Sequence, residues 1–273
     1  MSRVQYNFKS ILLLSSIMQK KTRDFQRFIS LSLALAKAEF KMRNEGSYLG
    51  VLWYLLNPIL LFIVLLVVFS ARFGNEIPSY PLYLIVGIVM YNFFQQTTTS
   101  AILNIDHGRH LIKSVKFPLE SLVASGVIRN VFSHFFEIAV LVLFALFYGV
   151  SLIGFIYYIP LLFLFCIFIY GISLILAGFY VYFIDLEHIW GFFTRILFFV
   201  TPIFYNVESM TKTYYLNLLN PLFYFITAGR EIIIYNRLPE SWIIIVIFFG
   251  SFIFLFFGLI IFEKLKYKFA ERL

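Results

Sequence analysis

The chain has 273 residues, of which 61% are hydrophobic, 21% are aromatic and only 13% are charged. Soluble domains carry about 25% charged residues, so this composition excludes an ordinary soluble enzyme or binding domain. The net charge of +8 comes from basic residues that flank apolar runs, which indicates membrane topology and not a nucleic-acid partner. Because the apolar runs are long and continuous, we expect an all-α polytopic membrane protein and not an outer-membrane barrel.

The N-terminal residues are basic and lead into the apolar part of the chain. Residues 1–23 are expected to be a cytoplasmic tail, because their apolar stretch is too short for a signal peptide. Residues 24–44 predict an amphipathic helix in the membrane interface, with apolar side chains at 3- and 4-residue steps. These side chains are Phe25, Phe28, Ile29, Leu33, Ala36 and Phe40. A simple anchor without a mechanical role is the alternative.

Six apolar runs predict membrane-spanning helices. They cover residues 49–71, 80–103, 119–148, 155–184, 189–205 and 241–262. The polar segment 104–118 separates the second run from the third, and residues 263–273 form a basic C-terminal tail. Together, residues 24–262 are expected to form one membrane domain.

The distribution of Lys and Arg predicts the orientation of these spans. Nine of these residues lie in residues 1–48, three in 104–118 and four in 263–273. The positive-inside rule places all three segments in the cytoplasm. Both termini are then cytoplasmic, which requires an even number of crossings, and six spans satisfy this condition.

Residues 201–240 are apolar and aromatic but too interrupted for a single span. Asn220-Pro221 breaks any helix through the middle, because proline lacks an N–H and restricts the preceding residue. A single crossing here would also move the basic C-terminal tail outside. We therefore expect residues 206–240 to form a re-entrant helical hairpin that enters from the extracellular side before the last span.

Ionisable or strongly polar side chains fall inside the predicted spans: Arg129, Asn130, His134, Glu137 and Arg195. Asn130, His134 and Glu137 are spaced 4 and 3 residues apart and share a helix face. Buried ionisable groups are functional candidates in membranes, so a proton relay is one hypothesis. We favour a structural polar network, in which Arg129 pairs with Glu137 or with another span. The arginine of the fifth span is expected to pair with an acid of residues 185–187.

No phosphate-binding loop, nucleophile elbow or zinc-helix motif occurs in the sequence. The single cysteine, Cys166, lies in an apolar run without a cysteine partner. We therefore expect no catalytic residue, no metal site and no cofactor bound by this chain.

Short motifs follow one another in a fixed order along residues 25–262. They are Gly50-Val51-Leu52-Trp53, Asn57-Pro58, Gly87, Tyr91-Asn92-Phe93-Phe94, the run LIKSVKFPLE from Leu111 to Glu120, Thr201-Pro202-Ile203-Phe204-Tyr205 and Leu219-Asn220-Pro221-Leu222. The ordered set resembles the membrane (permease) subunits of type-2 ABC exporters of polysaccharides, which move O-antigen, capsule or teichoic acid. The N-terminal extension lies outside this resemblance.

The resemblance implies a homodimer around a central channel, served by two copies of a separate ATP-binding subunit that binds ATP and Mg²⁺. The implied substrate is a polysaccharide linked to polyprenyl pyrophosphate, exported across the bacterial inner (cytoplasmic) membrane. Segment 104–118 would then present a short coupling helix to the ATPase. Its candidate contact residues are His107, Arg109, Leu111, Lys113 and Lys116.

Aromatic side chains near the predicted span ends are candidates for a sugar-stacking channel or gate. They are Tyr91, Phe94, Phe204, Tyr205, Tyr214, Tyr215, Phe223 and Tyr224. The alternative for each residue is the aromatic belt that marks membrane interfaces.

Three other functions remain open from the sequence. A drug or lipid exporter would share the fold. A polyprenyl-linked glycosyl- or acyltransferase would need clustered acids or histidines in a sizeable loop. An ion channel or secondary transporter would work without an ATPase and would make His134 and Glu137 central.

Overall fold

The computed structural model describes residues 24–43, 50–115, 117–206, 215 and 217–272. Within these ranges the chain is helical and contains no strand. Residues 24–43 form one helix, as the amphipathic pattern predicts. The predicted tail 1–23, Lys116, and residues 207–214 of the predicted hairpin lie outside the described residues.

The other helices follow one another with short connections. They are η1 (Gly50–Leu52), α2 (Trp53–Phe73), α3 (Tyr80–His107), α4 (Arg109–Ser114), α5 (Glu120–Phe147), α6 (Ile153–Tyr180), α7 (Leu186–Val200), α9 (Pro221–Ile233), α10 (Ser241–Leu265), η2 (Lys266–Lys268) and α11 (Phe269–Arg272).

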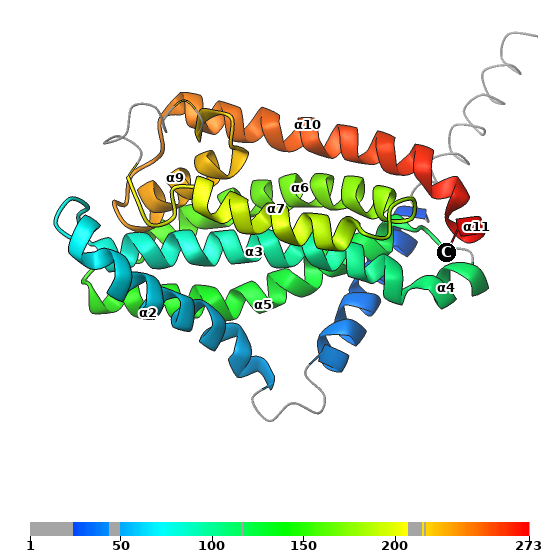
Figure 1. Ribbon diagram of the computed structural model, residues 1–273, viewed down its shortest axis with the longest axis horizontal. Helices are drawn as coiled ribbons and strands as arrows, with labels where there is room; N and C mark the ends of the chain where they lie inside the picture. The colour runs from blue at the N-terminus through cyan, green and yellow to red at the C-terminus, as the bar shows by residue number, and fades with distance from the viewer. Residues whose placement is uncertain (1–23, 44–49, 116, 207–214, 216, 273) are drawn as a thin grey trace, which may run out of the picture.

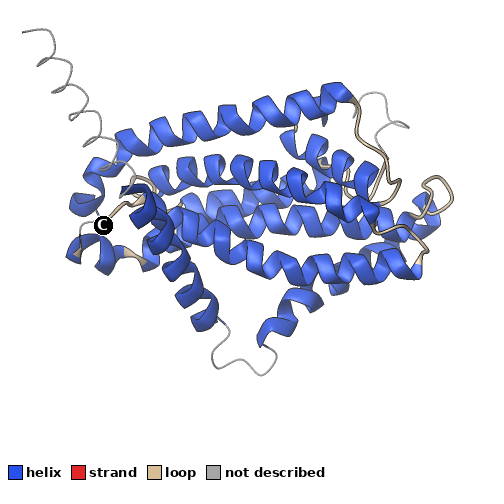
Figure 2. Ribbon diagram, turned by 180° about the vertical axis from the view of Figure 1, so that it is seen from behind, coloured by secondary structure: helices blue, strands red, loops and turns tan. Residues whose placement is uncertain are grey.

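Helix α3 lies at the centre of an elongated helical bundle (Figure 1). It packs against α2, α5, α6, α7 and α9, and α6 in turn packs along α10. Short elements gather at the two ends of the bundle, with α4 and α11 at one end and α9 at the other (Figures 1 and 2). We call these the α4 end and the α9 end.

Among the described residues, four helices are long and apolar enough to cross a membrane: α2, α5, α6 and the continuous helical stretch Ser241–Lys268. The sequence predicted six spans. The other two correspond to α3 and α7, and each fails the length or hydropathy criterion for its own reason. Helix α3 has 28 residues but carries the polar run from Gln95 to Ser100, which lowers its hydropathy. Helix α7 has only 15 residues, about 22 Å at 1.5 Å per residue, which is shorter than the hydrocarbon layer.

Close backbone approach between α6 and α10 depends on two glycines. A Cβ on Gly171 would overlap the backbone of Phe254 and Leu255, and a Cβ on Gly258 would overlap the backbone of Gly171. Small residues at such crossings let membrane helices pack tightly where burial of apolar surface adds little. Helices α6 and α10 therefore form one closely packed pair.

Helix α9 begins where the Asn-Pro dipeptide predicts a break. Asn220 is the N-cap, and its side-chain Oδ1 accepts a hydrogen bond from the Leu222 N–H at 3.0 Å. Its Nδ2 donates to the Thr201 hydroxyl at 2.8 Å, which ties the start of α9 to the end of α7. Because α9 has 13 residues, about 20 Å, it is too short to span a bilayer on its own.

Candidate functional site

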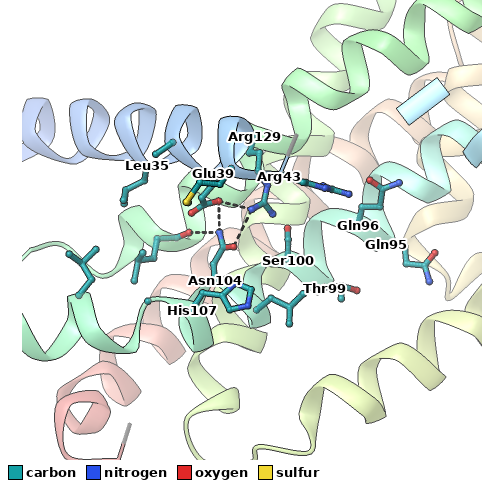
Figure 3. A pocket seen from close by; sticks show the side chains of 16 residues that line it. Leu35, Glu39, Arg43, Gln95, Gln96, Thr99, Ser100, Asn104, His107 and Arg129 are labelled. Carbon is teal, nitrogen blue, oxygen red and sulfur yellow. Dashed lines mark hydrogen bonds and ion pairs between the residues drawn. The ribbon is translucent and has the colours of Figure 1, made fainter. Parts of the chain in front are cut away.

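A cavity of about 1010 Å³ opens near the α4 end, between helix 24–43, α3 and α5. Polar side chains from all three helices line it, and Figure 3 shows Glu39, Asn104 and Arg129 pointing toward one another. They are Glu39, Arg43, Gln95, Gln96, Thr99, Ser100, Asn104, His107 and Arg129. Leu111 of α4 also reaches this wall, so the cavity adjoins the predicted coupling segment.

Glu39 is the centre of the polar cluster in this cavity (Figure 3). Its carboxylate accepts hydrogen bonds from Arg129 Nη1 at 2.6 Å and from Asn104 Nδ2 at 3.1 Å. The hydroxyl of Ser125 donates to the other carboxylate oxygen at 3.0 Å. One acid from helix 24–43 therefore joins α3, through Asn104, to α5, through Arg129 and Ser125.

The Arg129 guanidinium is buried, with only 10% of its side chain exposed. A buried charge is tolerated when an opposite charge and hydrogen bonds compensate it, and Glu39 supplies both. The carbonyl oxygen of the Asn104 side chain lies 3.4 Å from Arg129 Nη1 and adds an acceptor. Removal of Glu39 would leave this cation inside the bundle without its carboxylate.

The pairing of Arg129 corrects one sequence prediction. Glu137, the proposed partner on the same helix, is bonded elsewhere, and the observed partner Glu39 comes from the peripheral helix. Sequence reasoning did not single out Glu39, although a signal was present. Glu39 lies three residues after Ala36 and next to Phe40, on the apolar face of the amphipathic helix.

A second polar cluster lies deeper in the bundle and is sealed from solvent. His134 Nδ1 lies 2.7 Å from Glu137 Oε2, and the Tyr158 hydroxyl lies 2.9 Å from His134 Nε2. The Phe93 ring stacks on the imidazole with centroids 4.4 Å apart. All three polar side chains are buried, and each has a hydrogen-bond partner within the cluster.

Asn130 belongs to a different set of contacts from His134 and Glu137. Its Nδ2 donates to the Ser100 hydroxyl of α3 at 2.7 Å, beside the Glu39 cluster. Within the described part of the chain, no hydrogen bond connects Asn130 to His134. The three residues that share a face of α5 therefore belong to two separate polar groups.

The predicted coupling residues lie at the α4 end. His107 ends α3 and is exposed, Lys113 is exposed on α4, and Leu111 is partly buried. Arg109 donates to Asp106 Oδ1 from Nη2 at 2.6 Å, and the Tyr180 hydroxyl of α6 donates to the same oxygen at 2.6 Å. The Tyr180 hydrogen bond and the nearby guanidinium hold the pKa of Asp106 below its usual value, so this acid stays ionised.

Arg230 occupies a corresponding buried position at the α9 end. Its three nitrogens donate to main-chain carbonyls of Tyr83 at 3.2 Å, Pro202 at 2.7 Å and Ile203 at 2.8 Å. Its guanidinium carbon also lies 3.4 Å from the centre of the Tyr83 ring. A Cβ at Gly87 would come within 2.7 Å of the Arg230 Nη2, so glycine leaves the room that the guanidinium needs.

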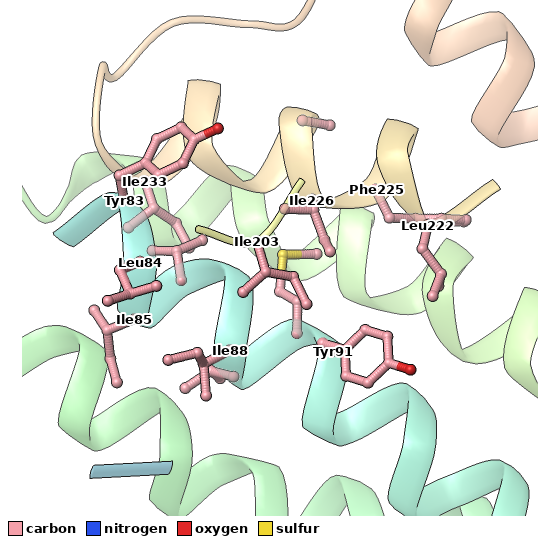
Figure 4. Close-up of a cluster of buried hydrophobic side chains, with 14 of the residues drawn as sticks. Tyr83, Leu84, Ile85, Ile88, Tyr91, Ile203, Leu222, Phe225, Ile226 and Ile233 are labelled. Atoms are coloured by element: carbon pink, nitrogen blue, oxygen red, sulfur yellow. The ribbon is translucent and has the colours of Figure 1, made fainter. Parts of the chain in front are cut away.

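The segment that Arg230 holds is non-helical and enters the core. Ile203 is fully buried between α3 and α9, among side chains such as Ile88 and Ile226 (Figure 4). The hydroxyls of Tyr80 and Tyr83 donate to the carbonyls of Phe204 and Tyr205 at 3.0 Å each. Irregular backbone at depth needs such donors, because water does not reach it.

A second cavity, of about 650 Å³, opens beside this segment at the α9 end. Its walls carry aromatic and charged side chains: Glu76, Tyr83, Phe223, Arg230, Glu231, Tyr235, Arg237, Glu240 and Trp242. Glu231 is already engaged by an ion pair with Arg237.

Most of the predicted channel aromatics pack inside the subunit. Buried ones are Tyr91, Phe94, Tyr205, Phe223 and Tyr224. The hydroxyls of these buried tyrosines donate to main-chain carbonyls. The Tyr91 hydroxyl donates to the carbonyl of Thr194, and the Tyr224 hydroxyl donates to the carbonyl of Leu218 at 2.7 Å. Phe204 is half-buried and Tyr215 is 69% exposed, whereas Tyr214 lies outside the described residues.

Arg195 is exposed on α7, which itself is well exposed along one side. Its predicted partners were Asp185 and Glu187, but the ion pairs found in the described ranges include none between these residues. The exposed apolar side chains of α7 include Phe192, Ile196 and Phe199.

Residues 31–234 match the family model described as "ABC-2 type transporter". The chain belongs to the ABC-2 type transporter family. The matched region holds both buried arginines, the whole lining of the first cavity and α4. Together with four apolar helices, this establishes a multi-pass membrane protein and confirms the family that the ordered motifs suggested.

Two curated relatives carry the same descriptive name, "O-antigen export system permease protein RfbA". The protein from Klebsiella pneumoniae is 29% identical over 246 residues, which cover 89% of this chain and 95% of the relative. The protein from Myxococcus xanthus is 27% identical over 260 residues, which cover 94% of this chain and 100% of the relative. The chain and these permeases therefore correspond over nearly their full lengths.

Proposed function

We propose that this chain is the membrane subunit of an ATP-driven exporter that moves lipid-linked polysaccharide across the bacterial cytoplasmic membrane. Family membership and the names of the full-length relatives support the transporter class and the substrate class. The observation that carries the assignment furthest is the polar cavity of about 1010 Å³ that adjoins α4, because it lies between the proposed coupling segment and the helices that the segment would move.

In the proposed topology, both termini and α4 are cytoplasmic and the α9 end faces outward. The four apolar helices cross the membrane, and α3 and α7 provide two further crossings. Neighbouring helices shield the polar run of α3, and the non-helical residues 201–206 extend the reach of α7. Helix α9 would then be one half of a re-entrant hairpin that enters from the outer side. Clusters of Lys and Arg at the cytoplasmic segments support this orientation.

The working exporter would be a homodimer of this chain with two copies of a separate ATP-binding subunit. ATP and Mg²⁺ would bind to those partner subunits and not to this chain. The polymer, attached to polyprenyl pyrophosphate, would be accepted at the cytoplasmic leaflet and would move along a path between the two copies. Exposed aromatic surface, such as that of Tyr215, is suited to stack on sugar rings.

Coupling would begin at α4 and reach the cavity through short polar contacts. Movement of α4 is transmitted to α6 by the contact of Arg109 and Asp106 with Tyr180. The end of α3 carries Asn104, which contacts Glu39, so helix 24–43 would shift relative to α5. At the α9 end, Arg230 holds residues 202–203 in place as part of the outer gate.

Deletion of the gene followed by glycolipid analysis tests this function. Finished lipid-linked polysaccharide should accumulate inside the cell while surface polysaccharide disappears, and the gene supplied in trans should restore the surface polymer. Unchanged surface polysaccharide in the deletion strain would contradict the proposal. Loss of both surface and intracellular polymer would indicate a role in synthesis and would equally contradict export.

A further inference from the structure

The chain continues beyond α10 and folds back against the coupling segment. After α10 it forms η2 (Lys266–Lys268) and α11 (Phe269–Arg272), and α11 lies beside α4 (Figures 1 and 2). From the sequence, these residues are expected to form only a basic tail. Their contacts give them a structural connection to the coupling element.

Buried apolar contacts unite α11 with α4. Phe269 is fully buried and meets Phe262 edge to face, with ring centroids 5.5 Å apart. Ile112, the buried residue of α4, belongs to the same apolar cluster as both phenylalanines. Helix α4 has six residues and cannot be stable alone, so this shared cluster helps to fix its position.

An ion pair joins the same C-terminal segment to Glu120, the first residue of α5. Lys266 Nζ lies 2.7 Å from Glu120 Oε1 and 2.5 Å from Glu263 Oε2. Glu120 is the first residue of α5, so Lys266 bridges the end of α10 to the start of α5. The Arg272 guanidinium lies over the Tyr182 ring, 4.5 Å from its centre, and holds the last turn against the end of α6.

The exposed side of this unit combines apolar and basic groups. Val115 is 51% exposed directly after α4, and Tyr267 is 74% exposed in η2. Exposed basic side chains accompany them on both elements: His110, Lys113, Lys264 and Lys268. Tyrosine is among the residue types that protein interfaces enrich, and the cations around Tyr267 favour an acidic partner.

We propose that α4 and the C-terminal segment 264–272 together form the docking surface for the ATP-binding subunit. This inference rests on the proposed function and specifies its partner surface. The partner would present an apolar pocket rimmed by acids, which receives Val115 and Tyr267 together. Because Lys266 and Phe269 connect the surface to α5 and α10, a push by the partner moves these helix ends as one unit.

Site-specific photocrosslinking tests the surface without disturbing its buried contacts. Benzoylphenylalanine replaces Val115, Tyr267 or, as a control at the α9 end, the 65% exposed Leu238. In membranes that contain the permease and its ATP-binding subunit, we expect crosslinks to that subunit from positions 115 and 267 and none from position 238. A crosslink from position 115 without one from position 267 would overturn the composite surface.

A matched pair of substitutions tests the positioning role of Lys266. Lys266→Met should reduce ATPase stimulation by the permease about fivefold, the effect of about 1 kcal/mol of contact energy, and Lys266→Arg should retain it. Lys37→Met removes an exposed lysine of helix 24–43, outside the proposed docking surface, and should leave stimulation unchanged. Equal effects of Lys266→Met and Lys37→Met would contradict a specific role for the bridge.

Co-purification distinguishes a failure of the proposed function from a failure of the proposed docking surface. If no ATP-binding subunit co-purifies with the unmodified chain, the proposed function fails and this inference fails with it. If the subunit co-purifies but position 267 gives no crosslink, only the composite docking surface is wrong.

Discussion

Arg129 and Arg230 are both buried guanidinium groups, but they are satisfied by different kinds of partner. Arg129 contacts side chains, the carboxylate of Glu39 and the amide of Asn104, which belong to two other helices. Arg230 contacts main-chain carbonyls of Tyr83, Pro202 and Ile203, and it lies over the Tyr83 ring. One arginine connects helices, and the other holds a piece of irregular backbone.

This difference assigns different mechanical roles to the two ends of the bundle. Glu39 can separate from Arg129 while helix 24–43, α3 and α5 all remain helical, so the contact suits helices that move relative to one another. The carbonyls of residues 202–203 lie in non-helical backbone, so no N–H of a described helix donates to them. Loss of Arg230 would therefore leave buried acceptors unsatisfied, and the α9 end is built to keep its shape.

The largest effect is expected from Arg230→Met. The substitution keeps an apolar stem but removes the donors of two buried non-helical carbonyls, those of Pro202 and Ile203, each worth about 1–3 kcal/mol, so the stability loss should reach about 2–6 kcal/mol. Thermal unfolding of the purified protein in detergent measures it. Arg230→Lys should recover part of the loss, since lysine keeps the charge without the planar fork. A wild-type unfolding midpoint for Arg230→Met would refute this account of the α9 end.

Glu39→Gln should have the next largest effect and should act differently. Arg129 would lose its carboxylate, which costs up to about 3 kcal/mol for a pair that is mostly buried. In a double-mutant cycle with Arg129→Gln, the two changes should couple by at least about 1 kcal/mol. Export should fall as well, because helix 24–43 loses its connection to α5.

Asp24→Asn is the matched control for Glu39→Gln, since it makes the same kind of acid-to-amide change on an exposed residue of the same helix. Its effect on stability should stay within about 0.5 kcal/mol. Additive effects of Glu39→Gln and Arg129→Gln would show that the two residues act independently, contrary to the contact described above.

The smallest effect is expected from Tyr158→Phe in the sealed cluster. It removes one hydrogen bond from His134 and should lower stability by about 1–2 kcal/mol. If the cluster is structural, as we infer, export should persist with an unchanged pH profile between pH 6 and pH 8. A shifted pH profile of export would favour a proton relay instead.

Local sequence patterns predicted the elements that depend on local chemistry. Asn220-Pro221 marked the start of α9, and the 3- and 4-residue apolar steps marked helix 24–43. Both features act through neighbouring residues, so a single sequence reveals them. The ordered motifs likewise indicated the family before any fold was known.

Contacts between distant segments could not be predicted in the same way. The partner of Arg129 lies 90 residues away on a different helix, and nothing in the spacing of α5 points to Glu39. The polar run Gln95–Ser100 is tolerated because neighbouring helices surround α3, which hydropathy alone does not reveal. The role of Phe269 also depends on tertiary packing, because a four-residue helix gives no periodic signal.

Transport in inverted membrane vesicles tests the central claim most directly. Vesicles that contain this chain and its ATP-binding subunit are loaded on their outer leaflet with lipid-linked polysaccharide, and the fraction protected from added glycosidase is measured. ATP should increase the protected fraction, and vesicles that lack this chain should show no increase. Protection that is independent of ATP, or equal in vesicles without the chain, would contradict the account.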